Sequence, residues 1–396
     1  MRDGYGKTIY ACFIAYIVQA IINNFAPLLF LMFRSSYGIP LSRITMLATV
    51  NFGLQLLVDL ASVGFVDKIG YRASMVMANI FASAGLVALA VLPDCVADPF
   101  FGLLVSVILY AIGGGLLEVL VSPIVEACPT DNKERVMSLL HSFYCWGHVG
   151  VVLISTVFFH LFGVTNWKIL ACGWALVPLY NVFLFARVPI ASLIEEGEQG
   201  ISVKELAGRK VFWVFMLMML CAGASEQSVS QWASTFAEKG LGVSKTVGDL
   251  AGPMAFALLM GSARAFYGKY GEKLDLEKFM KGSSILCVLS YLCICLTASP
   301  AAGLIGCAVC GLSVGIMWPG TFSRAAACIP RGGTVLFALM ALAGDLGCSG
   351  GPALVGMVSG FFGEDLKKGI LAAVVFPVLL LFGILICRKM TEKGPA

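Results

Sequence analysis

The sequence is poor in charge: 13% of its 396 residues are Asp, Glu, Lys or Arg, against about a quarter in a soluble domain. Long polar stretches are scarce too, and the longest runs only from residue 189 to 210. The chain has three His residues, no GxxxxGK[ST] phosphate-binding motif and no GxSxG motif near them. These absences argue against a soluble globular protein, an ATP-driven pump and a serine hydrolase.

Apolar residues make up 59% of the chain, and they fall into runs long enough to cross a bilayer, which takes about 20 residues in a helix. The first run is too long for the core of a signal peptide, so we expect it to be retained. The sequence therefore predicts an all-α integral membrane protein. We expect twelve transmembrane helices, at residues 8–33, 42–66, 73–93, 100–127, 136–162, 166–187, 210–236, 246–267, 279–298, 300–328, 333–361 and 369–387.

Positive charges indicate the orientation of these spans. If the N-terminus is cytoplasmic, most of the 27 Lys and Arg residues, Arg264 among them, lie on the cytoplasmic side. This bias satisfies the positive-inside rule and predicts a multi-pass protein of the cytoplasmic membrane with both termini inside. The net charge of +4 then reflects topology and contact with anionic lipids, and we expect no nucleic-acid partner. The exceptions are Arg34, Arg43, Lys168, Lys239, Lys245, Lys367 and Lys368.

An internal repeat divides the chain. Gly115, Pro123 and Arg135 recur 196 positions later as Gly311, Pro319 and Arg331. The repeat predicts an N-terminal half at 1–188, a cytoplasmic linker at 189–209 and a C-terminal half at 210–396. Because each half holds six spans, the halves have the same orientation, and two parallel six-helix repeats around a central cavity are typical of the major facilitator fold.

The turn after the second span, GFVDKIGYR, contains Asp67, Lys68 and Arg72. It is similar to the signature loop between the second and third spans of major facilitators. An Asp at a helix end can accept hydrogen bonds from a neighbouring helix N-terminus and pair with Arg or Lys, which favours a cytoplasmic gate. The alternative is an ordinary charged turn that follows the positive-inside rule.

Carboxylates inside the fourth span are the first candidate functional groups. Glu118, Ser122 and Glu126 are spaced i, i+4 and i+8, so they project from one helix face, which should line the bundle interior or a wet cavity. Glu126 lies about one turn from the cytoplasmic end and is expected near water. Glu118 lies about 15 Å from that end and cannot reach bulk water without a cavity.

Three blocks narrow the resemblance: LEVLVSPI (117–124), MSLLHSFYCWG (137–147) and GIMWPGTFS (315–323) resemble the fucose permease branch of the major facilitators, a group of sugar:proton symporters. The resemblance implies that Glu118 is the protonatable carboxylate. It also implies that His141 and Tyr144 contact sugar hydroxyls. The block NNFAPLL, which supplies Asn23 and Asn24 as further substrate-binding candidates, departs from the family by having Pro27 where an Asp is expected.

A second coupling carboxylate must then lie elsewhere. Asp59 shares a stripe with Asn51 and Gln55, which could instead tie helices together, and Asp345 is the only acid in the middle of its span. Glu226 lies in EQSVSQW, the most polar block of the seventh span. We expect substrate contacts from Glu226, Gln227, Gln231, Trp232 and, as a second stacking platform, Trp318.

The leading hypothesis is a secondary active transporter of a sugar or related hydroxylated metabolite, driven by a proton gradient and working by alternating access. The alternatives are proton-coupled efflux of amphipathic drugs or metabolites and, more remotely, a non-transporting sensor or a membrane enzyme. We expect a small-molecule substrate, lipid contact, function as a monomer and no cofactor. His141, Cys145 and His148 have a spacing that could hold a metal, but the sequence offers no further ligands and we expect no metal site.

Overall fold

The computed structural model describes residues 4–39, 41–191, 201–233, 250–297, 299–363 and 365–392, and its regular elements there are all helical. Contacts divide the chain into two units. The first comprises Met1–Asp131 and Phe143–Glu195, and the second comprises Asn132–Ser142 and Glu196–Ala396. The first turns of helix α6 (Lys133–Phe162) therefore cluster with the second unit, although the sequence assigns them to the N-terminal half.

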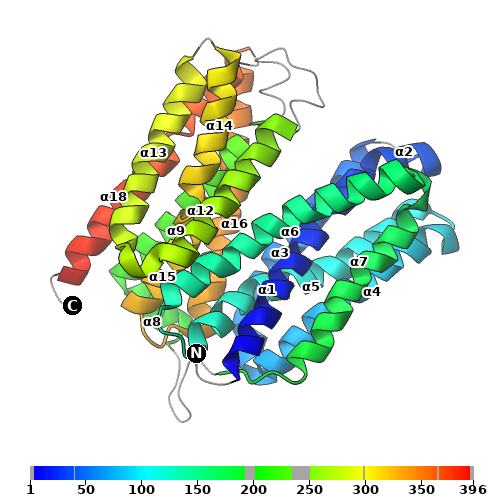
Figure 1. The fold of residues 1–396 in the computed structure, drawn as a ribbon, viewed down its shortest axis with the longest axis horizontal. Helices are drawn as coiled ribbons and strands as arrows, with labels where there is room; N and C mark the ends of the chain where they lie inside the picture. The colour runs from blue at the N-terminus through cyan, green and yellow to red at the C-terminus, as the bar shows by residue number, and fades with distance from the viewer. Residues whose placement is uncertain are drawn as a thin grey trace. The chain divides into compact units, whose positions relative to one another are not determined.

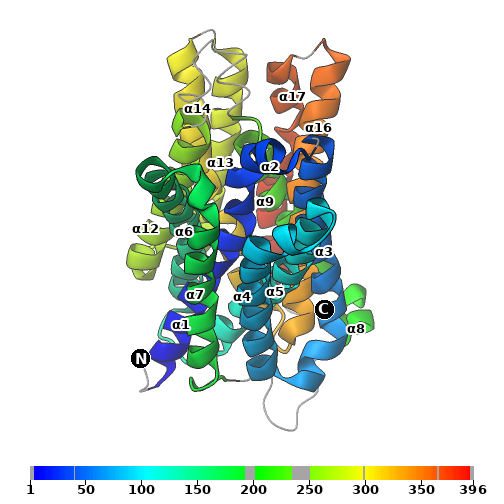
Figure 2. The same ribbon diagram turned by 90° about the vertical axis from the view of Figure 1, so that its right-hand side faces the viewer.

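In the first unit, α4 packs against α5 and α7, and α5 also contacts α1 and α3 (Figures 1 and 2). Asp98 caps α5, because its carboxylate accepts a hydrogen bond from the backbone N–H of Phe100 at 3.0 Å. The elements outside α6 are α1 (Tyr5–Asn24), the 3₁₀ turn η1 (Ala26–Leu29), α2 (Phe30–Tyr37), α3 (Leu41–Ile69), α4 (Tyr71–Cys95), α5 (Pro99–Ala127), η2 (Val164–Asn166) and α7 (Trp167–Phe185).

In the second unit, α9 packs against α16 and α18, α13 lies between α14 and α18, and α12 packs on α14 (Figure 1). Ser299 and Asp275 cap α14 and α13 with their side-chain oxygens. The elements are α8 (Val203–Gly208), α9 (Lys210–Ser230), the π-helical turn η4 (Leu250–Met254), α12 (Ala255–Tyr270), η5 (Gly271–Lys273), α13 (Leu276–Leu296), α14 (Pro300–Val314), α15 (Met317–Cys328), α16 (Gly333–Phe361), α17 (Leu366–Ala372) and α18 (Val375–Glu392).

Ten segments among the described residues are long and apolar enough to cross a membrane. They correspond to ten of the expected spans, and α3 and α12 occupy the positions of the expected second and eighth. The expected eighth span begins within residues 234–249, which lie outside the described part of the chain. The chain is thus an all-α, multi-pass membrane protein.

Within the described residues, three expected spans contain a turn that lies just before a proline. Pro27 follows the end of α1, Pro319 follows the turn between α14 and α15, and Pro377 follows the turn between α17 and α18. Proline has no backbone N–H and clashes with the carbonyl four residues earlier, which explains the breaks. Pro123 and Pro352 stay inside continuous helices, so the residue type alone does not decide where a span breaks.

Glycines produce the same close helix contact in both units. A Cβ at Gly115 on α5 would lie 2.8 Å from the Cβ of Val58 on α3, and one at Gly311 on α14 would lie 2.3 Å from the carbonyl oxygen of Phe256 on α12. Small residues at such positions let helices approach closely in a membrane. The repeat seen in the sequence is therefore a repeat of packing as well.

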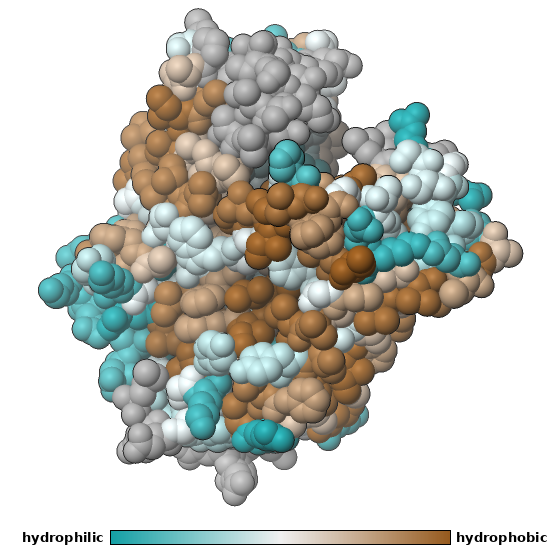
Figure 3. Space-filling view, turned by 45° about the vertical axis from the view of Figure 1, so that its right-hand side comes forward, coloured by the Kyte–Doolittle hydropathy of each residue, from teal (hydrophilic) through white to brown (hydrophobic). Residues whose placement is uncertain are grey.

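Much of the outer surface is apolar. Hydrophobic residues cover large areas of the face in Figure 3, and hydrophilic residues form separate patches on it. Leu161, Leu296, Met357 and Phe361 are each more than 60% exposed. Apolar surface on this scale would promote aggregation in water and suits a lipid environment.

Candidate functional site

A cluster of side-chain amides in the first unit holds Glu118. The amide nitrogen of Gln19 on α1 donates to Oε2 of Glu118 on α5 at 3.0 Å and to Oε1 of Gln55 on α3 at 3.2 Å. Gln55 donates to Asn23 at 2.8 Å and to Asn51 at 3.0 Å, and Asn51 donates to Asn23 at 3.1 Å. We call the four amides Gln19, Asn23, Asn51 and Gln55 the amide cluster. Together with Glu118 they join helices α1, α3 and α5.

The glycines next to Glu118 make this arrangement possible. A Cβ at Gly114 would lie 3.2 Å from Cδ of Gln55, so a larger residue would push the amide cluster apart. Gly113 and Gly115 also lie close to neighbouring helices, since a Cβ at either would lie within 3.0 Å of atoms on α4 or α3. Glu118 is half-buried, while Gln19 and Gln55 are each 2% exposed.

Below Glu118, the same face of α5 packs on α1. The hydroxyls of Tyr16 and Ser122 are 3.0 Å apart and both residues are buried. Glu126, one turn further on, is only 8% exposed, so the expectation that it reaches water is wrong. The helix packing that covers Ser122 therefore extends along this face of α5 to Glu126.

Asp59, the other candidate for proton coupling in this unit, lies one turn beyond Gln55 on α3 and is fully buried. It therefore shares helix α3 with Asn51 and Gln55 of the amide cluster. Asn24 donates its amide to the carbonyl of Ala20 in its own helix at 2.9 Å and so helps to finish α1 before Pro27. Of the two expected first-span amides, Asn23 belongs to the cluster.

The second unit contains a buried ion pair. The guanidinium of Arg264 on α12, 3% exposed, lies 3.2 Å from Oε2 of Glu226 on α9. It also donates to the carbonyl of Gly315 at 2.9 Å and to that of His141 at 3.3 Å. The sequence counted Arg264 among the cytoplasmic cations. Three acceptors hold its side chain inside the unit, and its side of the membrane stays a prediction.

The rest of the polar block on α9 lies near Glu226 or at the end of the helix. Gln227 follows Glu226 on α9 and is half-buried. Gln231 is exposed at the C-cap of α9. Trp232 donates its indole N–H to the carbonyl of Pro352 at 3.2 Å, and its ring lies against Gly356 on α16.

Three further candidates, His141, Trp318 and Asp345, belong to the second unit. His141 is 6% exposed and stacks on Phe322 with ring centroids 6.0 Å apart. The ring of Trp318 packs so closely on α16 that a Cβ at Gly344 would overlap it, and Asp345 is half-buried next to that contact. Tyr144 is half-buried on α6 and belongs to the first unit.

The gate candidates lie where α3 ends and α4 begins. Lys68 is exposed in the last turn of α3, and the side chain of Asp67 lies outside the described part of the chain. Arg72 donates to the carbonyl of Phe185, the last residue of α7, at 2.9 Å. A cation at the carbonyl end of a helix is favourable, so Arg72 ties α4 to α7.

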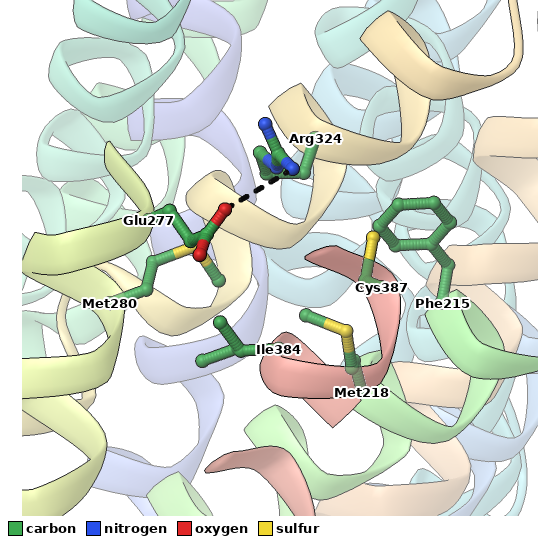
Figure 4. A pocket seen from close by; sticks show the side chains of 7 residues that line it. All are labelled: Phe215, Met218, Glu277, Met280, Arg324, Ile384 and Cys387. Atoms are coloured by element: carbon green, nitrogen blue, oxygen red, sulfur yellow. Dashed lines mark ion pairs between the residues drawn. The ribbon is translucent and has the colours of Figure 1, made fainter. Parts of the chain in front are cut away.

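A small pocket lies where α9, α13, α15 and α18 meet (Figure 4). Glu277 faces it and is approached by three cations: Lys281 at 2.6 Å, Arg324 at 3.6 Å and Arg388 at 3.9 Å. The pocket is no larger than a water molecule needs, so it is not a site for a sugar. Its lining is Phe215, Met218, Glu277, Met280, Arg324, Ile384 and Cys387.

Within the described ranges, no three His, Cys, Asp or Glu side chains are grouped as ligands for a metal ion. The buried polar side chains among the described residues are hydroxyls, amides, carboxylates, the imidazole of His141 and the guanidinium of Arg264. Buried ionisable groups of this kind within membrane spans mark solute or proton paths.

Many apolar spans, a duplicated helix packing and carboxylates held inside it define a polytopic transporter. The chain belongs to the Major Facilitator Superfamily, whose pattern matches residues 9–352. It is therefore a transporter rather than an enzyme. A curated relative, "Membrane protein MosC" of Rhizobium meliloti, is 23% identical over 291 residues, which are 73% of this chain and 68% of that protein.

Solved structures of this superfamily share the fold. FucP of E. coli, a fucose:proton symporter, superposes with a TM-score of 0.81 at 13% identity, over 97% of this chain and 99% of that one. The proton:xylose symporter XylE gives 0.83 at 11% identity, over 99% and 96%. The human organic anion transporter MFSD10 gives 0.71 at 14% identity, over 96% and 99%.

Proposed function

We propose that the protein is a secondary transporter of a small hydroxylated solute, most simply a sugar, coupled to protons through Glu118. The observation that carries the proposal is the hydrogen bond from Gln19 to Glu118 at 3.0 Å, within a cluster of four amides. FucP and XylE, which share the fold, are proton symporters of sugars.

Amides suit a sugar because each offers both donors and an acceptor, which match hydroxyl groups. Asn23 is the half-buried member of the amide group, so it can meet a solute, whereas Gln19, Asn51 and Gln55 are at most 5% exposed and support it. Asn24, His141, Tyr144, Glu226, Gln227, Gln231, Trp232 and Trp318 remain proposed contacts, and Asp59 and Asp345 remain proposed partners in proton coupling.

Glu118 links solute and proton in this proposal. Ionised, it accepts the hydrogen bond from Gln19; protonated, it becomes a donor, and the amide cluster must rearrange around it. A proton taken up from outside would favour solute binding, and its release inside would favour solute release. The two halves would expose the site alternately, with Asp67, Lys68 and Arg72 proposed as the cytoplasmic gate.

We also propose that the protein works as a monomer in the cytoplasmic membrane, with both termini inside, lipid as its surroundings and no bound cofactor. The excess of Lys and Arg on one side of the spans supports this orientation. Reporter fusions at each terminus test it: cytoplasmic reporters should be active at both ends, and an external reporter active at either end would contradict it.

Uptake into proteoliposomes tests the proposed transport. Purified protein is supplied with a panel of radiolabelled pentoses and hexoses, with and without an inward proton gradient. We expect at least one sugar to accumulate, and a protonophore to abolish the accumulation. Sugar entry that never exceeds equilibrium would contradict coupling, and proton release driven by amphipathic drugs would favour efflux instead.

A further inference from the structure

The break between α14 and α15 leaves a backbone carbonyl without its usual donor. In an α-helix the carbonyl of Gly315 accepts from the N–H of residue 319, but residue 319 is proline. Gly315 is buried and the next residue, Ile316, is 1% exposed, so water does not serve this carbonyl. A buried carbonyl in an apolar setting requires a donor.

Arg264 supplies that donor. Its Nε lies 2.9 Å from the carbonyl oxygen of Gly315. The approach depends on the absence of a side chain at Gly315, where a Cβ would lie 2.8 Å from the Cβ of Ala263 and 2.9 Å from the carbonyl of Met260. The close packing of α14 on α12 thus brings the guanidinium to the break.

The same guanidinium holds other helices. Its NH2 group pairs with Glu226 on α9 at 3.2 Å, and its NH1 group donates to the carbonyl of His141 on α6 at 3.3 Å. The hydroxyl of Ser138 on α6 donates to the backbone carbonyl of Arg264 at 2.8 Å. A planar guanidinium has five N–H donors in fixed directions, so it can serve acceptors on several elements at once.

We propose that Arg264 is a positioning residue that replaces the donor missing at Pro319. The α14–α15 break is thereby a joint, by which we mean a helix break stabilised by a side chain from another helix. Arg264 of α12 is that side chain, and the carboxylate of Glu226 orients its guanidinium. The first unit has no such joint at the matching place, because α5 runs unbroken through Pro123, the repeat partner of Pro319. This role depends neither on the solute nor on proton coupling.

A double-mutant cycle in thermal unfolding tests the proposal. In a Glu226→Gln background, which removes the charge that Arg264 neutralises, Arg264→Met should lower Tm by about 3 °C or more. Pro319→Ala restores an N–H at residue 319, so in its presence the same substitution should cost less than half as much. Pro123→Ala is the control, and its effect should add to that of Arg264→Met. An equal loss of Tm with and without Pro319→Ala would overturn the proposal.

Hydrogen exchange provides a second measurement that needs no change at Arg264. Glu226→Gln alone should speed amide exchange in peptides that contain Ile316–Trp318, because the guanidinium loses the partner that orients it. Peptides from α5 around Pro123 should exchange as in the unsubstituted protein. Unchanged exchange across the α14–α15 break would refute the link to Glu226.

Discussion

Gln19 is the residue that joins the proposed proton site to the proposed solute site. Its amide nitrogen is shared between Glu118 and Gln55, and it is 2% exposed. Removing this donor takes one hydrogen bond from each of two acceptor oxygens, Oε2 of Glu118 and Oε1 of Gln55. Its position four residues before Asn23 on α1 was the signal in the sequence, since the two amides share a helix face.

Gln19→Leu should lower the free energy of unfolding by about 1–3 kcal/mol, the usual cost of removing one partner of a buried hydrogen bond. Thermal or denaturant unfolding in detergent measures it. Asn166→Ala is the control: this exposed amide donates to the carbonyl of Phe162, and we expect a change below about 0.5 kcal/mol. Equal effects of the two substitutions would contradict the account of the amide cluster.

Tyr37 gives a prediction outside the membrane spans. Partial burial, and then the hydrogen bond from its hydroxyl to Asp94 at 2.8 Å, raise the pKa of Tyr37 above its ordinary value of about 10. The folded state therefore holds this proton more tightly, so its contribution to stability is complete below pH 10 and is lost as pH rises further.

An absorbance titration of tyrosinate compares the protein with Tyr37→Phe. The difference between the two curves should correspond to one tyrosine, which ionises at a higher pH than an ordinary tyrosine. Tyr180→Phe, which removes a 52% exposed tyrosine, is the control. A difference curve for Tyr37 centred at or below pH 10 would show that neither burial nor Asp94 acts on it.

At the scale of helices, close glycine contacts should decide stability. A Cβ at Gly311 would lie 2.3 Å from a backbone oxygen of α12, and backbone cannot give way as a flexible side chain can. Gly311→Ala should therefore destabilise the protein by about 1–3 kcal/mol. A Cβ at Gly282 on α13 would have no atom within 4 Å. Gly282→Ala should therefore stabilise the protein by up to about 1 kcal/mol, because alanine favours the helix.

The measurement is the shift in Tm of each variant in the same detergent. Opposite signs are expected for Gly311→Ala and Gly282→Ala. Equal destabilisation by the two substitutions would contradict the prediction. It would mean that the close contact at Gly311 matters no more than the free space around Gly282.

The sequence predicted the helices well but not their breaks. Runs of apolar residues identify spans because a bilayer requires about 20 of them. Proline, however, is tolerated within membrane helices when neighbours satisfy the freed carbonyl, so the break at Pro319 and the continuity at Pro123 depend on packing that the sequence does not display. The same holds for Pro27, which ends α1.

At the scale of the whole molecule, the candidate site was only partly predictable. Glu118 and Asn23 were identified, and the structure joins them through Gln19 and Gln55. The burial of Arg264 was missed because a cation six residues from the end of α12 looks like part of the cytoplasmic positive charge. Its acceptors come from α9, the α14–α15 turn and α6, which are distant in the sequence.

The central claim is that Glu118 couples solute movement to protons within this major facilitator transporter. Neutral Gln resembles the protonated carboxyl in shape and charge. It can therefore complete solute exchange, in which no net proton moves, but it cannot release a proton. Glu126→Gln, on the same helix face but outside the amide cluster, is the matched control.

The most direct measurement compares two assays in proteoliposomes with the sugar that the panel identifies. Glu118→Gln should retain exchange of labelled for unlabelled sugar and lose accumulation driven by a proton gradient, while Glu126→Gln should retain both. Accumulation by Glu118→Gln equal to that of the unsubstituted protein would contradict the account.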